Sequence, residues 1–160
     1  MGTRLVHEMT YDAPAIEVAG MLTDPPFRET VCRNQRATSY TVEIEGSVDA
    51  KAVRIEMEQP TDQVPSFAKK FIGETTTIVQ TETWRGPLEA DVTVGIPGKP
   101  GEITGTVTLA EADGVTTETV DLEIKVKIPL VAGKIEELLA KLLGSALRAE
   151  ERTGREWLGR

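Results

Sequence analysis

The chain from Gly133 to Trp157 reads GKIEELLAKLLGSALRAEERTGREW. Apolar residues recur in it at intervals of three, four and seven, the spacing that places side chains on one face of an α-helix. The pattern predicts a helix over residues 134–157, which would extend roughly 36 Å at about 1.5 Å per residue and therefore needs a large apolar partner. Glu136, Glu137, Lys141 and Arg148 occupy its other faces. Its apolar stripe consists of Ile135, Leu138, Leu139, Leu142, Leu143, Ala146 and Leu147.

Most of the chain before this helix alternates between apolar and polar residues, a pattern typical of half-buried antiparallel strands. It predicts seven strands, over residues 3–11, 37–46, 53–58, 75–84, 90–96, 103–109 and 120–128. Asp12-Ala-Pro14 and Asp24-Pro-Pro26 are helix-start signals, so we expect two short helices between the first and second strands. The predicted fold class is α+β, a curved seven-stranded antiparallel sheet wrapped around the long C-terminal helix.

This order of elements, together with several short motifs, resembles a known superfamily. Tyr11-Asp-Ala-Pro14, followed by Asp24-Pro25, resembles the opening of the START-like (SRPBCC) superfamily, which has the helix-grip fold. More narrowly, the chain resembles the uncharacterised bacterial family DUF2505, a domain of unknown function. The stretches that carry this second resemblance are His7–Asp12, Phe27–Glu29, Pro65–Phe71, Ile96–Gly101 and Lys125–Val131.

The resemblance covers nearly the whole chain and implies one START-like helix-grip domain over residues 1–160. Members of the superfamily carry lipids, catalyse dehydrations or bind other proteins, so the resemblance implies the fold more closely than the function. The alternative is a generic α+β domain whose sheet packs on the helix without a cavity. Three Phe, two Trp and two Tyr are few large rings for filling a concave sheet, which favours a cavity.

Composition narrows the possible partners. The net charge of −8 argues against non-specific binding to nucleic acid or anionic membranes. No apolar run approaches the ~20 residues that span a bilayer, so we expect no integral membrane association, and the first residues lack a secretory pattern. A single cysteine, Cys32, excludes an internal disulfide and fits a reducing compartment, so we expect a cytoplasmic protein. One histidine and one cysteine cannot form a Cys/His zinc site, and we expect neither a metal nor a cofactor.

The candidate ligand-binding residues are those that the alternation places on the inner face of the sheet, on the apolar face of the long helix, or on a short helical segment near residue 70. In a helix-grip fold that segment is a natural gate beside the open edge of the sheet. The candidates are His7, Met9, Tyr40, Val42, Ile55, Met57, Phe67, Phe71, Gln80, Trp84, Val92, Val94, Leu122, Ile124, Leu139 and Leu143.

Two of the inward positions are weak catalytic candidates, His7 and Glu82. His7 shares a strand face with Met9 and Tyr11, where it is either a ligand contact or a hydrogen-bonded core histidine. Glu82 faces inward if the strand buries Ile78 and Trp84, the phase that we favour, and outward if the threonines of that strand face inward. A buried Glu82 needs a partner or a raised pKa, and His7 or Arg54 could serve as that partner.

Three functions remain open. The first is binding or transport of a small hydrophobic or lipid-like ligand inside the cell, in a cavity between the sheet and the C-terminal helix. The second is an enzyme of the polyketide cyclase or dehydratase type that uses His7 or Glu82 in the cavity. The third is a protein-interaction module, with Trp157 and Leu158 as an anchor for a partner protein. The sequence does not determine the oligomeric state.

Overall fold

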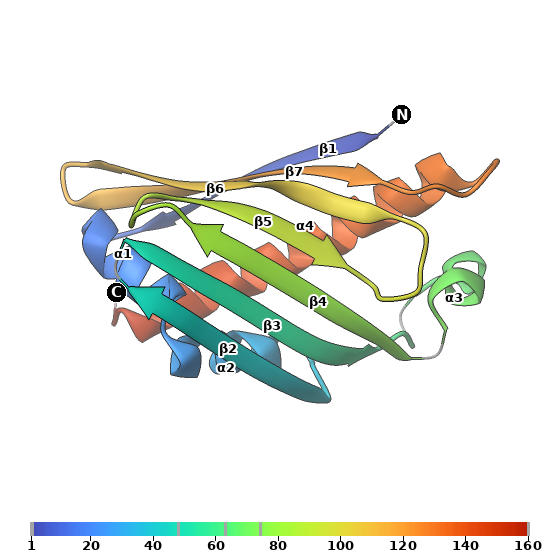
Figure 1. Cartoon of the computed structure of the whole chain (residues 1–160), viewed down its shortest axis with the longest axis horizontal. Coiled ribbons are helices and arrows are strands. Elements are labelled where there is room, and N and C mark those ends of the chain that lie inside the picture. Colours follow the sequence, from blue (N-terminus) through green and yellow to red (C-terminus); the bar gives the residue numbers. More distant parts are fainter. Residues whose placement is uncertain (1, 48, 63, 74, 160) are drawn as a thin grey trace.

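The computed structural model describes residues 2–47, 49–62, 64–73 and 75–159. Its strands form one antiparallel sheet in the order β1-β7-β6-β5-β4-β3-β2 (Figure 1). The strands are β1 (Thr3–Tyr11), β2 (Ser39–Ser47), β3 (Ala50–Pro60), β4 (Thr75–Trp84), β5 (Glu89–Gly95), β6 (Glu102–Ala112) and β7 (Val115–Lys125). The helices are α1 (Ala15–Leu22), α2 (Pro25–Asn34), α3 (Ser66–Ile72) and α4 (Ala132–Trp157). This is the helix-grip fold that the sequence predicted.

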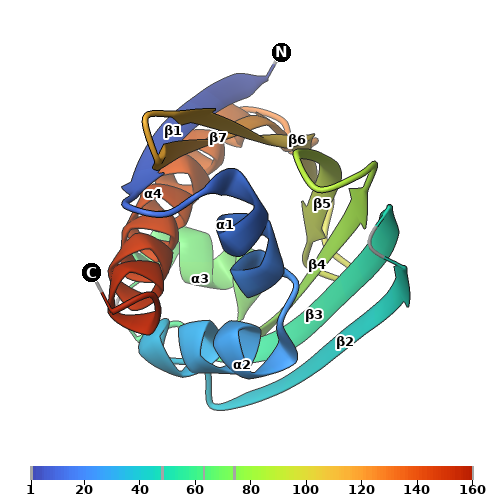
Figure 2. The ribbon, with the colours of Figure 1, turned by 90° about the vertical axis from the view of Figure 1, so that its left-hand side faces the viewer.

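The sheet curves around α4, as the view along the molecule shows (Figure 2). In that view α1 and α2 lie on the concave side of the sheet, at the end nearer the reader, and α4 runs back between β1 and α2. Two hydrogen bonds fix α2 to α4: Asn34 donates to Thr153 (2.8 Å) and Gln35 to the Ala146 carbonyl (3.0 Å). The concave face of the sheet is therefore covered at one end by short helices and along its length by α4.

α1 begins directly after the start signal Asp12-Ala-Pro14, at Ala15, but no side chain of that signal caps it. Instead Glu111, at the far end of β6, accepts a hydrogen bond from the Ala15 amide (2.7 Å). A carboxylate at a helix N-terminus satisfies an otherwise unpaired N–H group and interacts favourably with the helix dipole. This cap comes from a residue almost a hundred positions away, so no local sequence signal could reveal it.

The last strand also has different bounds. β7 begins at Val115, directly after the turn at Asp113-Gly114, and ends at Lys125, whereas the alternation predicted residues 120–128. Pairing with β6 explains the earlier start, because the β6–β7 ladder continues to Ala112 and Val115 beside the turn. The extension brings Glu118 into the strand, where it is 2% exposed and in phase with Val120.

The apolar stripe of α4 is less buried than a core helix would be. Leu138, Leu139 and Leu143 are half-buried, and Leu142 is 42% exposed. Full burial occurs instead mainly at small or polar residues of α4, and the buried set is Ile135, Glu136, Gly144, Ala149, Glu150, Thr153 and Gly154. The helix thus contacts the sheet closely near its two ends, and its leucines face open volume between them.

Glu136 lies outside the apolar stripe of the helix but is buried nevertheless. It is 4% exposed and joins three elements of the fold. Its two carboxylate oxygens accept hydrogen bonds from the Thr3 hydroxyl (2.8 Å) and from the Val126 amide (2.9 Å). Buried charges persist where they are hydrogen-bonded in this way. Glu136 fixes the beginning of α4 to the start of β1 and the end of β7.

Candidate ligand-binding site

A cavity of about 450 Å³ lies between the concave face of the sheet and α4. This volume falls within the roughly 300–1,000 Å³ of typical small-molecule sites. The sheet contributes inward-facing residues of β3 to β7, and α4 contributes part of its leucine stripe. The apolar lining includes Ile78, Val92, Val94, Ile103, Val107, Val120, Leu122, Ile124, Leu139, Leu142, Leu143 and Leu147.

The predicted ligand-binding residues divide into two groups. Those that line the cavity are Met57, Phe71, Gln80, Val92, Val94, Leu122, Ile124, Leu139 and Leu143. Those that do not line it are His7, Met9, Tyr40, Val42, Ile55, Phe67 and Trp84. The first group comes mainly from the centre of the sheet and from mid-α4. Most of the second group lies near the sheet edges, where α2 packs against β2 and α4 against β1.

The phase of β4 is the one that we favoured. Ile78, Gln80 and Glu82 line the cavity, and Trp84 is buried beyond them. Glu82 is 3% exposed, and each of its oxygens accepts hydrogen bonds from this same strand face. Gln80 donates to Oε2 (2.7 Å) and the Trp84 indole to Oε1 (2.9 Å). The end of the cavity beside Glu82, which we call its inner end, is therefore polar although the walls of the cavity are apolar.

The buried partner of Glu82 is Arg28, on α2, and not His7 or Arg54 as the sequence suggested. Its Nη2 lies 2.7 Å and 2.9 Å from the two oxygens of Glu82, and its Nε donates to the Leu22 carbonyl (2.6 Å). Nη1 lies 3.5 Å from Oε1 of Glu150 on α4. Arg28 is 3% exposed, so this ion pair is screened little by solvent.

His7 and Glu82 do not form a catalytic pair. His7 faces inward on β1, but β7, β6 and β5 separate that strand from β4. The Nε2 atom of His7 is buried without a hydrogen-bond partner in the described part of the chain, and the residue does not line the cavity. Arg54 lies on the outer face, in ion pairs with Glu43 and Glu56. Alternation along one strand gives the face of a residue, whereas its distance from another strand depends on strand order.

Two more carboxyl groups accompany the Arg28–Glu82 pair at this end of the cavity. Glu118, on β7, and Glu150, on α4, both line it and are 2% and 6% exposed. Burial raises the pKa of Glu118 well above its usual range, and the neighbouring carboxylate of Glu150 raises it further, against the lowering effect of Arg28. Burial also raises the pKa of Glu150, again opposed by Arg28. We call Arg28, Glu82, Glu118 and Glu150 the buried charge cluster.

Sequence reasoning missed three members of this cluster, although a signal for each was present. Glu118 continues the period-two phase of Val120 and Leu122. Glu150 follows Ala146 by four residues on the apolar face of α4, and Arg28 lies beside Phe27 and three positions before Val31. A charged residue in phase with an apolar face is the sign to look for. Nothing in the sequence indicated that the three would meet.

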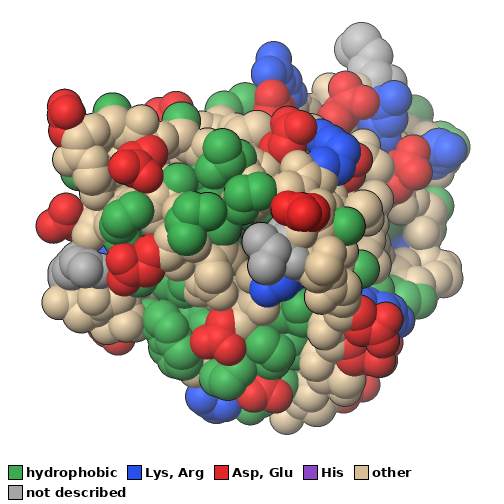
Figure 3. All heavy atoms as spheres, turned by 60° about the vertical axis from the view of Figure 1, so that its left-hand side comes forward, with side chains coloured by type: hydrophobic (Ala, Val, Ile, Leu, Met, Phe, Trp, Pro, Cys, Tyr) green, Lys and Arg blue, Asp and Glu red, His purple; other side chains and the backbone are tan. Residues whose placement is uncertain are grey.

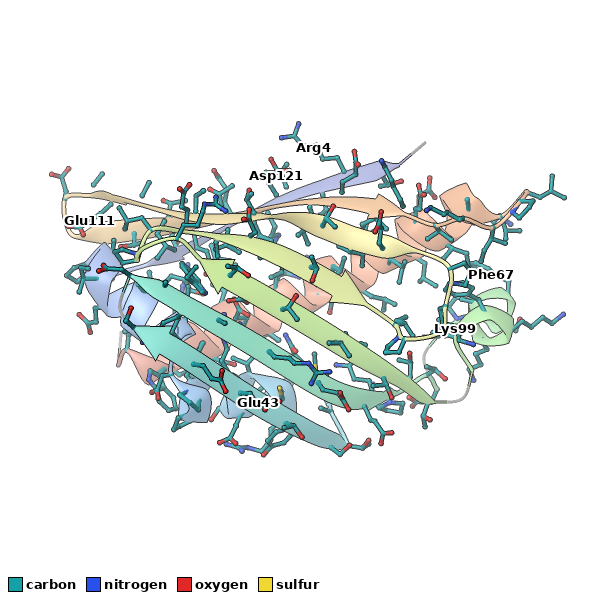
Figure 4. The ribbon with its side chains drawn as sticks, viewed as in Figure 1. Arg4, Glu43, Phe67, Lys99, Glu111 and Asp121 are labelled. Carbon is teal, nitrogen blue, oxygen red and sulfur yellow. The ribbon has the colours of Figure 1, made fainter. Side chains whose placement is uncertain are left out.

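The outer part of the cavity has a different character. Its lining includes the exposed basic residues Arg36, Lys99, Lys125 and Arg152, and one exposed acid, Glu102. α3 borders this part through Phe71 and Ile72. Phe67, on the other side of α3, is 42% exposed and packs beneath the Lys134 ammonium (5.6 Å from the ring centroid). Phe67 and Lys99 lie at the same end of the molecule (Figure 4), whereas the face shown in Figure 3, toward the α1 end, carries more acidic than basic side chains.

Solved structures with the same arrangement, a sheet that wraps around one long helix, match this chain. A Thermus thermophilus protein, TTHA0849, has a TM-score of 0.67 and 15% identity, over 96% of this chain and 95% of its own. A START superfamily protein from Mycobacterium smegmatis has a TM-score of 0.64 and 13% identity, over 97% and 98%. The di-domain ARO/CYC BexL, of the BE-7585A biosynthetic pathway, has a TM-score of 0.65 and 15% identity, over 97% and 49%.

At the level of sequence, the chain belongs to the DUF2505 family, described as "Protein of unknown function", which it matches over residues 6–158. No curated protein sequence matches it. Among the described residues, no helix is both long and apolar enough to cross a membrane. In the same part of the chain, no three His, Cys, Asp or Glu side chains converge in a way that could hold a metal ion.

Proposed function

We propose that this protein binds a small, mostly apolar molecule in the cavity between the sheet and α4, and holds or carries it in the cytoplasm. The observation that carries the proposal is the half-buried leucine stripe of α4, which faces apolar strand residues across open volume. Leaving apolar surface uncovered forgoes about 25 cal/mol for each Å² that could be buried. A ligand of matching shape would cover the surface that the chain itself does not cover.

The similar folds support this proposal at the level of class. Proteins of the START superfamily and ARO/CYC domains share the arrangement of sheet and helix, at identities that relate folds and not ligands. The single cysteine, Cys32, can form no internal disulfide, which fits a reducing compartment. Burial raises the pKa of its thiol to about 11. Such a thiol remains protonated and unreactive.

Native mass spectrometry of the purified protein, followed by denaturing extraction, tests the proposal. We expect an apolar adduct in stoichiometric amount. Leu143→Phe should abolish the adduct because the larger ring occupies the cavity beside Leu139. Val6→Phe is the matched control, since Val6 is 51% exposed on the outer side of β1 and its substitution leaves the cavity unchanged.

Thermal unfolding provides a second readout of the same proposal. A ligand that binds only the folded state stabilises it by about 2.7 kcal/mol at a concentration of 100 times Kd. Apolar probes should therefore raise the unfolding temperature of the wild type and of Val6→Phe, but not that of Leu143→Phe. Equal shifts for both variants would place the binding outside the cavity and contradict the proposal.

An enzyme of the cyclase or dehydratase type is the second candidate, and Glu118 is the observation that favours it. A carboxyl group with a raised pKa inside an apolar cavity is suited to proton transfer. Glu82 is unsuited to this role because Arg28, Gln80 and Trp84 occupy both of its oxygens. If the compounds extracted from the wild type and from Glu118→Gln differ by a dehydration or a ring closure, catalysis is supported; identical compounds favour binding alone.

The interaction-module alternative does not use the cavity. Its predicted anchor, Trp157, is 43% exposed and packs edge-on against Phe27 with ring centroids 5.6 Å apart. Phe27 itself is fully buried. Trp157 thus already has an intramolecular role, in covering α2, and a partner protein remains the least supported of the three proposals.

A further inference from the structure

One oxygen at the inner end of the cavity has no hydrogen-bond partner among the described residues. It is Oε1 of Glu118, a residue 2% exposed that lines the cavity. A buried polar atom without a partner costs roughly 1–3 kcal/mol, and native structures contain few of them. The donors beside Glu118 are already engaged: the three nitrogens of Arg28 face Leu22, Glu82 or Glu150, and the Tyr11 hydroxyl hydrogen-bonds to the Glu118 carboxyl group. Oε1 is enclosed in this conformation, and because Glu118 lines the cavity, a rotation of its carboxyl group would bring this oxygen to a molecule bound there.

The charge at this end of the cavity decides which molecule suits it. The cluster sets three carboxyl groups against one guanidinium, a formal net charge of −2 once the pH exceeds the raised pKa values of Glu118 and Glu150. A ligand carboxylate placed there would add a fourth acid, and the one cation of the cluster is already paired. An ammonium group would compensate the excess negative charge and donate a hydrogen bond to Glu118, and charge-assisted hydrogen bonds of this kind are about twice as strong as neutral ones.

We propose that the natural ligand is an apolar amine, with its ammonium group at Oε1 of Glu118 and its apolar body along Leu139 and Leu143. This inference rests on the proposed function, because it names the chemical class of the ligand in the same cavity. The geometry of the acids favours an organic cation over a metal ion, since no three potential ligands converge among the described residues.

The basic residues of the outer cavity do not reverse this preference. Arg36, Lys99, Lys125 and Arg152 are exposed, so their attraction for an anionic head group is weakened by solvent and salt. A fatty acid bound there would insert its tail toward Glu118 and leave the free oxygen facing hydrocarbon. It would be held more weakly than an amine of equal length, and its affinity would not depend on Glu118.

Binding of an amine also has a defined dependence on pH. Glu118 must release its proton to pair with an ammonium group. The groups around it are Arg28 on α2, Glu82 on β4, Glu150 on α4 and Tyr11 on β1. Burial, with the two acids, outweighs Arg28 and Tyr11 and raises the pKa of Glu118, so affinity for an amine rises as the pH increases through that value and Glu118 ionises. Affinity for an uncharged alcohol of the same length changes little over this range.

The experiment compares decylamine, decanol and decanoic acid by isothermal titration calorimetry, below their micelle concentrations, with wild type, Glu118→Gln and Glu43→Gln, at a pH above the raised pKa of Glu118. Glu43 is the matched control because it is exposed on the outer face of β2 and does not line the cavity. We expect decylamine to bind the wild type at least tenfold more tightly than decanoic acid. Glu118→Gln should remove most of that difference, while Glu43→Gln and the affinity for decanol should change less than about threefold.

The other possible outcomes contradict either the inference alone or the proposed function as well. If decanoic acid binds as tightly as decylamine, or if Glu118→Gln binds decylamine unchanged, the inference is wrong while the proposed function stands. If none of the three probes binds and the purified protein carries no adduct, the proposed function fails together with the inference. Should Glu118→Gln not fold, the ranking of the three probes on wild type and its change with pH still decide between these outcomes.

Discussion

At the scale of single residues, Arg28 is the side chain on which the inner end of the cavity depends. It connects α2 to β4 through Glu82 and to α4 through Glu150, and all of these side chains are buried. A buried ion pair contributes little net stability compared with an apolar replacement of both partners, but removal of one partner leaves an uncompensated charge. Substitution of Arg28 alone should therefore lower the stability of the fold strongly, whereas simultaneous substitution of Arg28 and its partner should lower it less.

Arg28→Met should lower the free energy of unfolding by about 3–5 kcal/mol, because Glu82 and Glu150 lose the cation that they share. The double variant Arg28→Met/Glu82→Gln should recover a large part of this loss. Arg4→Met is the matched control: its ion pair with Asp121 lies on the outer surface (Figure 4), and exposed pairs contribute about 0–1 kcal/mol. Urea denaturation measures all three. Equal losses for Arg28→Met and Arg4→Met would contradict this account of the cluster.

Glu118 and Glu150 determine how stability depends on pH. Because their pKa values are raised in the folded protein, the folded state holds these protons more tightly than the unfolded chain does. This contribution is complete below the ordinary carboxyl range and is lost as the pH rises toward the raised values. The free energy of unfolding should therefore fall as the pH rises above the ordinary carboxyl range, and less steeply in Glu118→Gln. An unchanged slope in the variant would show that Glu118 is ionised throughout.

At the scale of elements, α4 has two parts with different packing. Its leucines face the cavity, and its last third packs closely against β1 and α2 through Ala149, Thr153 and Gly154. A Cβ atom at Gly154 would lie 2.6 Å from Cε1 of Tyr11 and 3.0 Å from the terminal methyl of Met21. Glycine there permits the close approach of strand and helix.

The glycines of α4 supply a paired test. Gly154→Ala should destabilise the protein by about 1–3 kcal/mol because the Tyr11 ring is held in the core and cannot move aside. Gly144→Ala should stabilise it by up to about 1 kcal/mol, since the nearest atom is the flexible end of Arg148 at 3.5 Å. Chemical denaturation of both variants gives the comparison. If both are stabilised, the contact between α4 and β1 is looser than described.

At the scale of the whole molecule, the distribution of free volume separates the cavity from the packed core. Leu143 lines the cavity, whereas Val18 on α1 is fully buried among core residues. Leu143→Phe should change the free energy of unfolding by less than about 1.5 kcal/mol because the added atoms enter empty space, whereas Val18→Phe should cost about 1–3 kcal/mol or more through overpacking. Equilibrium unfolding in urea tests both. Similar costs at the two positions would indicate a filled interior.

The sequence by itself determined the elements of this protein and most of their inward faces. The alternation in β4 and β5 and the stripe of α4 identified Gln80, Val92, Val94, Leu139 and Leu143 as inward-facing residues that line the cavity. These signals are local, because the periods of strand and helix fix which side chains share a face.

Only the tertiary structure decided which of those faces meet. It separated His7 from Glu82 by strand order and placed Arg28 beside Glu82. It also left open volume where the leucines of α4 cross the sheet and buried Glu118 at the inner end of that volume. The physical reason is that these contacts join residues far apart in sequence: they depend on sheet curvature and strand order, which the periodicity of one segment does not contain.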